Sequence, residues 1–415
     1  MFRASISNDS KSTCFWAWNG SLDEDELVRQ LHFMESIGLA GFFIHSREGL
    51  ETEYLGPDWD RCVKRVAKEA EKAGLEAWIY DEDRFPSGTC GGKVTSVLDE
   101  KYALHGLTIE VSRDYPEELL RASYRARIDG NLLVDLERIN GRCELGPDEV
   151  YLLVRFEKSA GSVWFNGSAP PDNLSKETVE EFIRTTHKHY LKLLGKGSAF
   201  LPGFFSDEPS LADRHAKFNP NRSWMPWSYG MDQYYAQVNE GKDIYDDFPY
   251  LFFDGEKRAE TRFRYWRTIA LRYEECYSKT IASWCRDNHY LFTGHYLQED
   301  KMGLSTRVNG SIMPHYTHQD IPGIDILCEK CDEYMTVKQA SSVASQYGKK
   351  RVFAETYAAC GWDVTLTSLR WIAEWERVLG VTNRVIHQIL IRFVAPESAT
   401  ILHSSESSTR HLICF

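Results

Sequence analysis

Two glutamates that each follow a short apolar run have the chemistry needed for acid–base catalysis. Glu208 lies in the segment FFSDEP (204–209), and Glu355 lies in the segment VFAETY (352–357). Partial burial at the end of a strand raises the pKa of a carboxyl group toward the range of a general acid. Hydrolysis of a glycosidic bond requires two such groups, one that donates a proton and one that acts as a base or nucleophile. We therefore predict that Glu208 and Glu355 are catalytic.

Both glutamates also have a structural alternative. Asp207 and Glu208 would suit the start of a helix, where Pro209 is favoured. Glu355 follows an apolar run, so its carboxylate would need an ion-pair partner if it had no catalytic task. The catalytic prediction therefore depends on the two glutamates as a pair, because they follow different strands and could face each other across one site.

A third acidic segment, YDEDR (80–84), follows another apolar run. Asp81, Glu82 and Asp83 could bind sugar hydroxyls or contribute oxygen ligands to a hard cation such as Ca²⁺. Neutralisation by Arg84 is the structural alternative. A metal-dependent hydrolase built on these acids is a further hypothesis, and it predicts that a chelator would abolish activity.

Several polar and aromatic side chains near other strand ends are candidates for contact with substrate. Trp16, Trp18 and Trp362 could form a stacking platform for a sugar ring, although one or two of them are expected in the core. Histidines at strand ends, such as His45, are more often structural and gain weight only from polar neighbours. The predicted substrate-binding residues are Trp18, Asn19, His45, Arg47, Asp81, Glu82, Arg84, Asp207, His295, Trp362 and His387.

The pair Cys328 and Cys331 has the CxxC spacing of zinc and redox sites. A structural zinc site needs four ligands, and no second CxxC or close histidine pair follows. We therefore expect two ordinary thiols on one helical turn. The sequence also lacks a glycine-rich phosphate loop and a GxSxG nucleophile motif.

The elements that would position these residues follow the alternation of a (β/α)8 barrel. Eight apolar runs are separated by helical patterns, including those at 21–38, 58–74, 175–194 and 258–288. A barrel of this kind has its active site at the carboxyl ends of its strands, which is where every polar cluster falls. The predicted strands are 14–20, 40–47, 75–84, 199–206, 290–296, 323–327, 351–356 and 381–386.

The alternation of strand and helix patterns is interrupted along the chain. We therefore predict four segments. Residues 1–100 hold the first three βα units, and residues 101–170 form an inserted β-rich subdomain with β-like runs at 105–111, 150–156 and 162–165. Residues 171–388 hold the remaining units, with a Trp-, Tyr- and Pro-rich excursion at 211–254. Residues 389–415 form an atypical, serine-rich tail that does not resemble the final barrel helix. We expect this apparent truncation to lower solubility or thermal stability.

Composition narrows the classes of partner. A net charge of −12 argues against a nucleic-acid partner, because such surfaces are normally basic. Hydrophobic residues make up 42% of the chain, which excludes general disorder, and no apolar run reaches the length of about 18 residues that a membrane span needs. The ten cysteines are too dilute for a disulfide scaffold, and no secretory signal is recognisable. We expect a cytoplasmic protein with a carbohydrate substrate.

Five motifs together resemble the catalytic barrel of glycoside hydrolase family 106, which is typified by α-L-rhamnosidases. They are WAWNG (16–20), GFFIHSREGLETEYLG (41–56), YDEDRFPSGTCGG (80–92), FFSDEP (204–209) and FAETYAACGW (353–362). The resemblance covers roughly residues 14–388. It implies a carbohydrate-active barrel that is normally part of a larger multidomain enzyme, an inverting mechanism and a calcium ion near the sugar site. It also implies that Glu208 is the acid and Glu355 the second carboxylate.

The leading hypothesis is a glycosidase that cleaves a terminal α-L-rhamnoside-like bond with two carboxylates. The rival hypothesis is an incomplete or inactive barrel that binds carbohydrate without hydrolysing it. The sequence leaves the stereochemical outcome open, because this outcome depends on the carboxyl separation. That separation is about 5–5.5 Å in retaining enzymes and about 6.5–9.5 Å in inverting enzymes.

Overall fold

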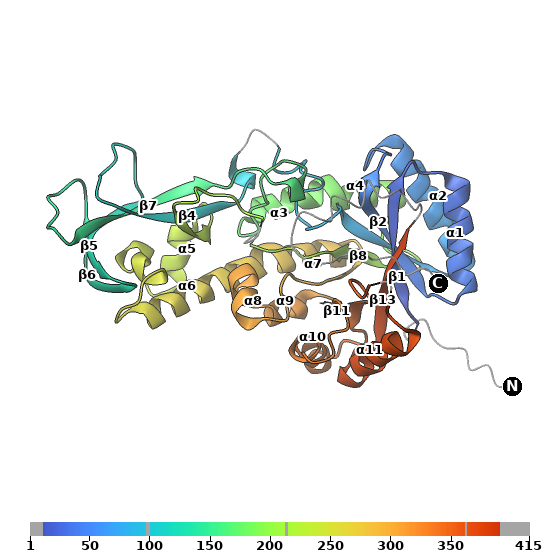
Figure 1. The fold of residues 1–415 in the computed structure, drawn as a ribbon. Helices are drawn as coiled ribbons and strands as arrows, with labels where there is room; N and C mark the ends of the chain where they lie inside the picture. Colours follow the sequence, from blue (N-terminus) through green and yellow to red (C-terminus); the bar gives the residue numbers. More distant parts are fainter. Residues whose placement is uncertain (1–10, 97–99, 212–214, 362, 391–415) are drawn as a thin grey trace.

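Eight parallel strands close into a barrel in the computed structural model, as the sequence predicted (Figure 1). The structure describes residues 11–96, 100–211, 215–361 and 363–390. The order around the barrel is β1-β13-β12-β11-β10-β8-β3-β2. The strands are β1 (Thr13–Gly20), β2 (Gly41–Leu50), β3 (Glu76–Asp83), β8 (Gly203–Ser206), β10 (Leu291–Gly294), β11 (Ile321–Ile326), β12 (Phe353–Thr356) and β13 (Asn383–Leu390). The (β/α)8 fold class is therefore confirmed.

Helices follow the strands along the chain, and most of them cover the outside of the barrel. The Asp23 side chain caps the first by accepting a hydrogen bond from the Glu26 backbone, and Gly74 ends the second in a left-handed conformation. The helices are α1 (Glu24–Ser36), α2 (Pro57–Ala73), α3 (Lys176–Phe182), α4 (Lys188–Leu194), α6 (Arg258–Tyr273), α7 (Lys279–Asp287), α8 (Met302–Asn309), α9 (Met313–His318), α10 (Met335–Gln346) and α11 (Leu366–Leu379). The predicted helices at 175–194 and 258–288 are continuous, each with one π-helical turn.

Strand alternation sorts the aromatic residues of β1 between two cores. Phe15 points into the barrel, where it packs with Phe43 and Phe205. Trp16 and Trp18 point outward, and the Trp18 ring lies 5.0 Å from the ring of Trp59 on α2. Both tryptophans are fully buried. The two tryptophans therefore belong to the core, as expected for one or two of the three, and neither ring has a face that a sugar could reach.

A five-stranded antiparallel sheet is inserted after β3 and projects from one side of the barrel (Figure 1). Its order is β6-β5-β7-β4-β9, and α5 (Met231–Val238) and α6 pack beside it. The strands are β4 (His105–Ser112), β5 (Ala122–Asp129), β6 (Leu132–Ile139), β7 (Glu149–Lys158) and β9 (Ser223–Trp227). The predicted run at 162–165 is not a strand, since Val163–Phe165 forms a single 3₁₀ turn. Strand β9 comes from the excursion at 211–254.

The hairpin of β5 and β6 was not predicted from the sequence, although β5 has the alternation of a half-buried strand. Ala122, Tyr124 and Ala126 are buried on one face. Arg125 pairs with Glu137 across the two strands at 2.5 Å, and Arg127 pairs with Asp135 at 2.5 Å. These ion pairs lie on the outer face of the hairpin, whereas Tyr124, Ala126 and Leu133 pack into the hydrophobic core from its inner face.

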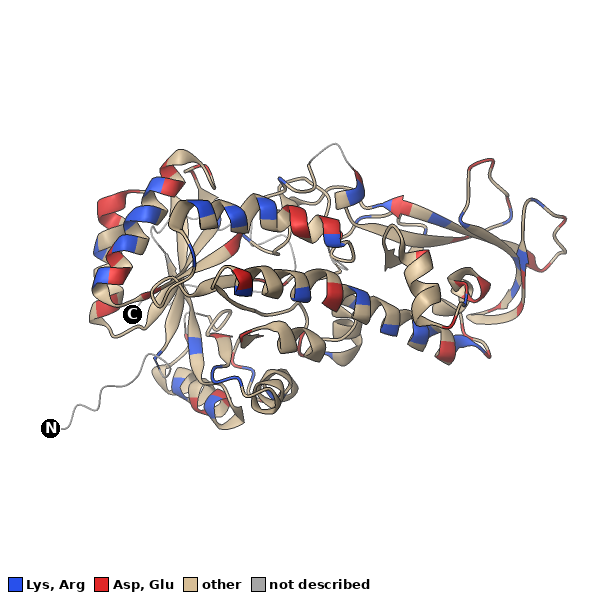
Figure 2. Cartoon of the chain, turned by 180° about the vertical axis from the view of Figure 1, so that it is seen from behind, with Lys and Arg blue, Asp and Glu red and all other residues tan. Residues whose placement is uncertain are grey.

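Charges of both signs are interspersed along the outer helices (Figure 2). In the described part of the chain, no helix combines the length and the apolar character that crossing a membrane requires. The predicted atypical tail begins in β13, and its residues 391–415 lie outside the described residues.

Candidate active site

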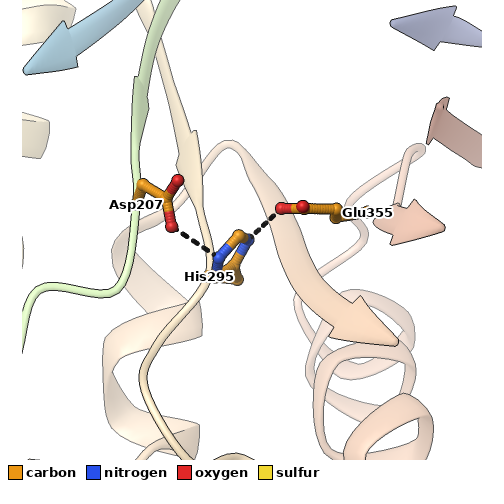
Figure 3. Close-up of side chains that lie close together, drawn as sticks. All are labelled: Asp207, His295 and Glu355. Carbon is orange, nitrogen blue, oxygen red and sulfur yellow. Dashed lines mark ion pairs between the residues drawn. The ribbon is translucent and has the colours of Figure 1, made fainter. Parts of the chain in front are cut away.

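The carboxyl ends of β8, β10 and β12 bring Asp207, His295 and Glu355 together in the mouth of the barrel (Figure 3). The Nε2 atom of His295 lies 2.8 Å from Oδ1 of Asp207, and its Nδ1 atom lies 3.7 Å from Oε2 of Glu355. His387, in β13, places Nδ1 2.7 Å from the other oxygen of Glu355. All four side chains are buried. Residues predicted from four separate strand ends therefore form one cluster.

Glu208 joins this cluster from the residue after Asp207. One ligand atom each from Glu208, His295 and Asp325 lies within 4.8 Å of the others. Glu208 has a φ of 46°, in the left-handed region that residues other than glycine adopt at a cost. Backbone strain of this kind is concentrated at functional sites. The two glutamates predicted to be catalytic thus both lie beside His295.

Asp207 and His295 form a buried ion pair. Burial alone would raise the pKa of Asp207, but the charge and hydrogen bond of His295 and the hydrogen bond from Tyr80 lower it below its usual range. Burial also opposes the charge on His295, yet Asp207 and then Glu355 and Asp325 raise the pKa of the imidazole well above its usual value. We conclude that Asp207 is ionised and that His295 is an imidazolium at neutral pH.

Asp325, in β11, is a carboxyl group of the site that was not predicted. Burial, followed by the nearby charge of Glu355, raises its pKa well above the usual range. Its Oδ1 atom is buried and has no hydrogen-bond partner in the described part of the chain. The sequence signal was an Asp within the predicted apolar strand 323–327, where a carboxyl group is costly without a task.

Glu299 fixes the backbone of Asp325 through hydrogen bonds. It accepts hydrogen bonds from the backbone N–H of Asp325 at 3.0 Å and from the Tyr316 hydroxyl at 2.7 Å. Burial raises the pKa of Glu299 to about 7. The site therefore holds two acids with raised pKa values next to one ion pair.

Tyr80 and His45 form the opposite side of the site. The Tyr80 hydroxyl donates a 2.5 Å hydrogen bond to Oδ2 of Asp207, and the His45 ring stacks on Tyr80 with centroids 3.7 Å apart. Burial, aided by the charge of Arg47, lowers the pKa of His45 well below its usual value, so its ring is neutral. Neither nitrogen of His45 has a hydrogen-bond partner among the described residues. Because the His45 ring is buried, its contact with substrate stays a prediction.

Asp81 is bonded internally and positions Asp207. Its side chain accepts hydrogen bonds from the hydroxyls of Ser87, at 2.6 Å, and Ser206. The Ser87 hydroxyl oxygen in turn accepts the backbone N–H of Asp207 at 2.8 Å. The fully buried Asp81 thus lacks the access to substrate that was predicted for it.

The other residues of the YDEDR segment also have internal partners. Asp83 accepts a 2.5 Å hydrogen bond from the Ser46 hydroxyl, and Arg84 pairs with Glu48. Glu82 is buried and accepts backbone N–H groups from the loop that follows it: those of Gly88 at 2.9 Å, Thr89 at 2.7 Å, Cys90 at 2.8 Å, Gly91 and Asp83. Glu82 therefore organises this loop from within.

The Glu82→Gln variant should be destabilised by at least about 2 kcal/mol. An amide keeps one acceptor but places a donor against backbone donors, and each buried donor left unsatisfied costs about 1–3 kcal/mol. Urea unfolding followed by circular dichroism measures the loss. The Glu71→Gln variant, at an exposed position of α2, is the matched control and should stay within about 0.5 kcal/mol of wild type. A wild-type unfolding midpoint for Glu82→Gln would contradict this role.

The remaining predicted residues are placed differently. Asn19 is buried at the end of β1, and Trp18 lies in the outer core away from the mouth. Trp362 lies outside the described residues. Cys328 and Cys331 lie in the loop between β11 and α10, so the prediction that they share a helical turn is wrong.

The residues present do not fit the calcium ion implied by the family resemblance. The three acids of the YDEDR segment have separate partners and form no ligand group among the described residues. Two other groups do converge, Asp207–His295–Glu355 and Glu208–His295–Asp325. Both include the imidazole of His295, whereas Ca²⁺ prefers a set of oxygen ligands.

Comparison with known proteins finds similarity of fold to solved structures. No protein-family model matches the chain, and no curated protein matches it. The structure of a rhamnosidase from Novosphingobium sp. PP1Y is similar, with a TM-score of 0.64 and 14% identity; the match covers 94% of this chain and 56% of that one. The chain thus spans about half the length of that rhamnosidase. An endo-1,4-beta-D-mannanase from Thermotoga petrophila RKU-1 matches with a TM-score of 0.43 and 10% identity, covering 91% and 88% of the two chains.

Proposed function

We propose that this protein is a glycoside hydrolase that cleaves a terminal, α-L-rhamnoside-like bond. The observation that carries the proposal is the convergence of Glu208 and Glu355 on His295 in the mouth of a closed barrel. Glycoside hydrolysis requires two carboxyl groups that flank the bond, one as the acid and one as the base or nucleophile. The five motifs that resemble family 106 and the fold shared with a rhamnosidase support the same class of substrate.

In this proposal Glu208 is the general acid. Asp207 is the other acid at the end of β8, but its ion pair with His295 lowers its pKa, so it has no proton to donate at neutral pH. Glu208 then protonates the oxygen of the leaving group as the bond to the sugar breaks.

Glu355 is the base or nucleophile. Its two oxygens contact His387 at 2.7 Å and His295 at 3.7 Å, which fixes the carboxylate in the mouth. The oxocarbenium-like transition state is positively charged, so the surrounding carboxylates stabilise it. The imidazolium of His295 balances part of their charge before substrate binds.

A panel of 4-nitrophenyl glycosides tests this function. We expect release of nitrophenol from the α-L-rhamnoside at a rate well above that of the double variant Glu208→Gln/Glu355→Gln. A barrel that only binds carbohydrate would bind these glycosides in calorimetry but release no phenol. Lack of turnover across the panel, with wild type and double variant alike, would reject the proposal.

A further inference from the structure

Arg47 is a cation of the barrel mouth that has no protein partner. It is half-buried in β2, and it makes no hydrogen bond or ion pair with any other residue of the described chain. The neighbouring Arg84, by contrast, pairs with Glu48, and Arg351 pairs with Glu76 at 3.3 Å. The Arg47 side chain is partly accessible, so its N–H groups can reach a ligand that enters the mouth.

Arg47 lies near the mouth of the barrel, because its charge acts on both His45 and Tyr80. Phe43, His45 and Arg47 alternate along β2, with Phe43 in the barrel interior and His45 stacked on Tyr80. Arg47 follows His45 by two residues toward the carboxyl end of β2, so it lies nearer the rim than His45. The charge of Arg47 lowers the pKa of His45, second only to burial, which agrees with this closeness.

An aromatic pair holds the Arg47 guanidinium in place. Its central carbon lies 5.1 Å from the centroid of the Phe85 ring, and the Phe85 ring lies 5.4 Å from that of Trp164. A cation–π contact uses the flat face of the guanidinium and leaves its N–H edges free for an oxyanion. Trp164 is 41% exposed and also contacts the ring of His215 at 4.8 Å. The inserted segment thus adds an accessible aromatic ring to the rim beside Arg47.

The topology places this rim across the barrel from part of the carboxyl cluster. In the closed strand order, β2 lies half-way round from β11, which carries Asp325. In the proposed reaction, the terminal sugar lies between Glu208 and Glu355 in the deep part of the mouth. The leaving group, which is the rest of the substrate, then extends toward the rim. Arg47 and Trp164 are therefore placed to meet the leaving group.

We propose that the leaving group of the substrate is a sugar that carries an oxyanion. Arg47 binds this oxyanion, and Trp164 stacks on the ring of the same sugar. The chemical class is a sugar acid whose carboxylate accepts two N–H groups of Arg47. A sulfate ester presents similar oxygens and is the alternative source of the charge. This inference rests on the proposed glycosidase function.

Matched disaccharides test the inference. Each carries a terminal α-L-rhamnose; the second sugar is a uronic acid, its methyl ester, or the related hexose 6-sulfate. We expect wild type to hydrolyse the free acid with a kcat/KM at least tenfold above that of the ester. The Arg47→Gln variant should lose this preference, so that its kcat/KM values on the free acid and on the ester agree to within about threefold. The Arg61→Gln variant removes the same charge from the outer surface of α2 and should retain the preference.

The outcomes separate this inference from the proposed function. Equal rates on acid and ester in wild type, or a preference that survives Arg47→Gln, would overturn the anion site. A preference for the sulfate over both would overturn the carboxylate assignment. If no glycoside is hydrolysed, the proposed function fails. Calorimetry with the free uronic acid and its neutral hexose then tests the anion site by itself, and equal affinity for the two would overturn it.

Discussion

The Glu208→Gln variant should lose 10²- to 10⁴-fold in kcat/KM on a natural disaccharide and far less on a dinitrophenyl glycoside. General acid catalysis is typically worth about this much, because it supplies the proton that a poor leaving group needs. A dinitrophenolate leaves without a proton, so loss of the acid matters little for it. Steady-state kinetics on both substrates measures the contrast.

The Glu355→Gln variant should behave differently, because a base or nucleophile is needed whatever the leaving group. Its loss should be similar on the two substrates. If the enzyme is retaining, azide should restore part of the rate and form a glycosyl azide. Equal losses on both substrates for Glu208→Gln would reject its role as the acid, and near wild-type rates in either variant would remove that residue from the site.

The Asp207→Asn variant should be destabilised by about 3–5 kcal/mol, because it leaves the buried charge of His295 without its partner. The Asp60→Asn variant is the matched control. Asp60 pairs with His189 at a similar distance of 2.7 Å, but both side chains are partly exposed to solvent. Its loss should therefore be at most about 1 kcal/mol.

The difference in the free energy of unfolding between wild type and Asp207→Asn should depend on pH in a defined direction. The pKa of His295 is raised in the folded protein, so its stabilisation is complete below its unfolded pKa of about 6.5 and is lost as the pH rises through the raised value. The pKa of Asp207 is lowered, so its stabilisation is complete above its unfolded pKa of about 3.9 and is lost as the pH falls. The stability gap between wild type and Asp207→Asn should be largest between about pH 4 and 6.5. A gap that widens at alkaline pH would contradict the ion pair.

The barrel could be predicted from the sequence because its strands are short apolar runs that end in polar residues. The same rule found Asp207, Glu208 and Glu355, which follow or end such runs. It missed Asp325, whose carboxyl group lies inside a run, and it overvalued Trp18, because strand alternation decides which side of β1 a residue faces. The internal hydrogen bonds of Asp81 and Glu82 could not be predicted, since their partners are loop backbone and serine hydroxyls that only folding brings near.

Proton NMR of a terminal α-L-rhamnosyl disaccharide incubated with the protein tests the central claim most directly. We predict that wild type releases free rhamnose, that the anomeric form produced first shows retention or inversion, and that Glu208→Gln/Glu355→Gln releases none on the same timescale. An unchanged spectrum with wild type, or rhamnose released equally by the double variant, would contradict hydrolysis by these two carboxyl groups.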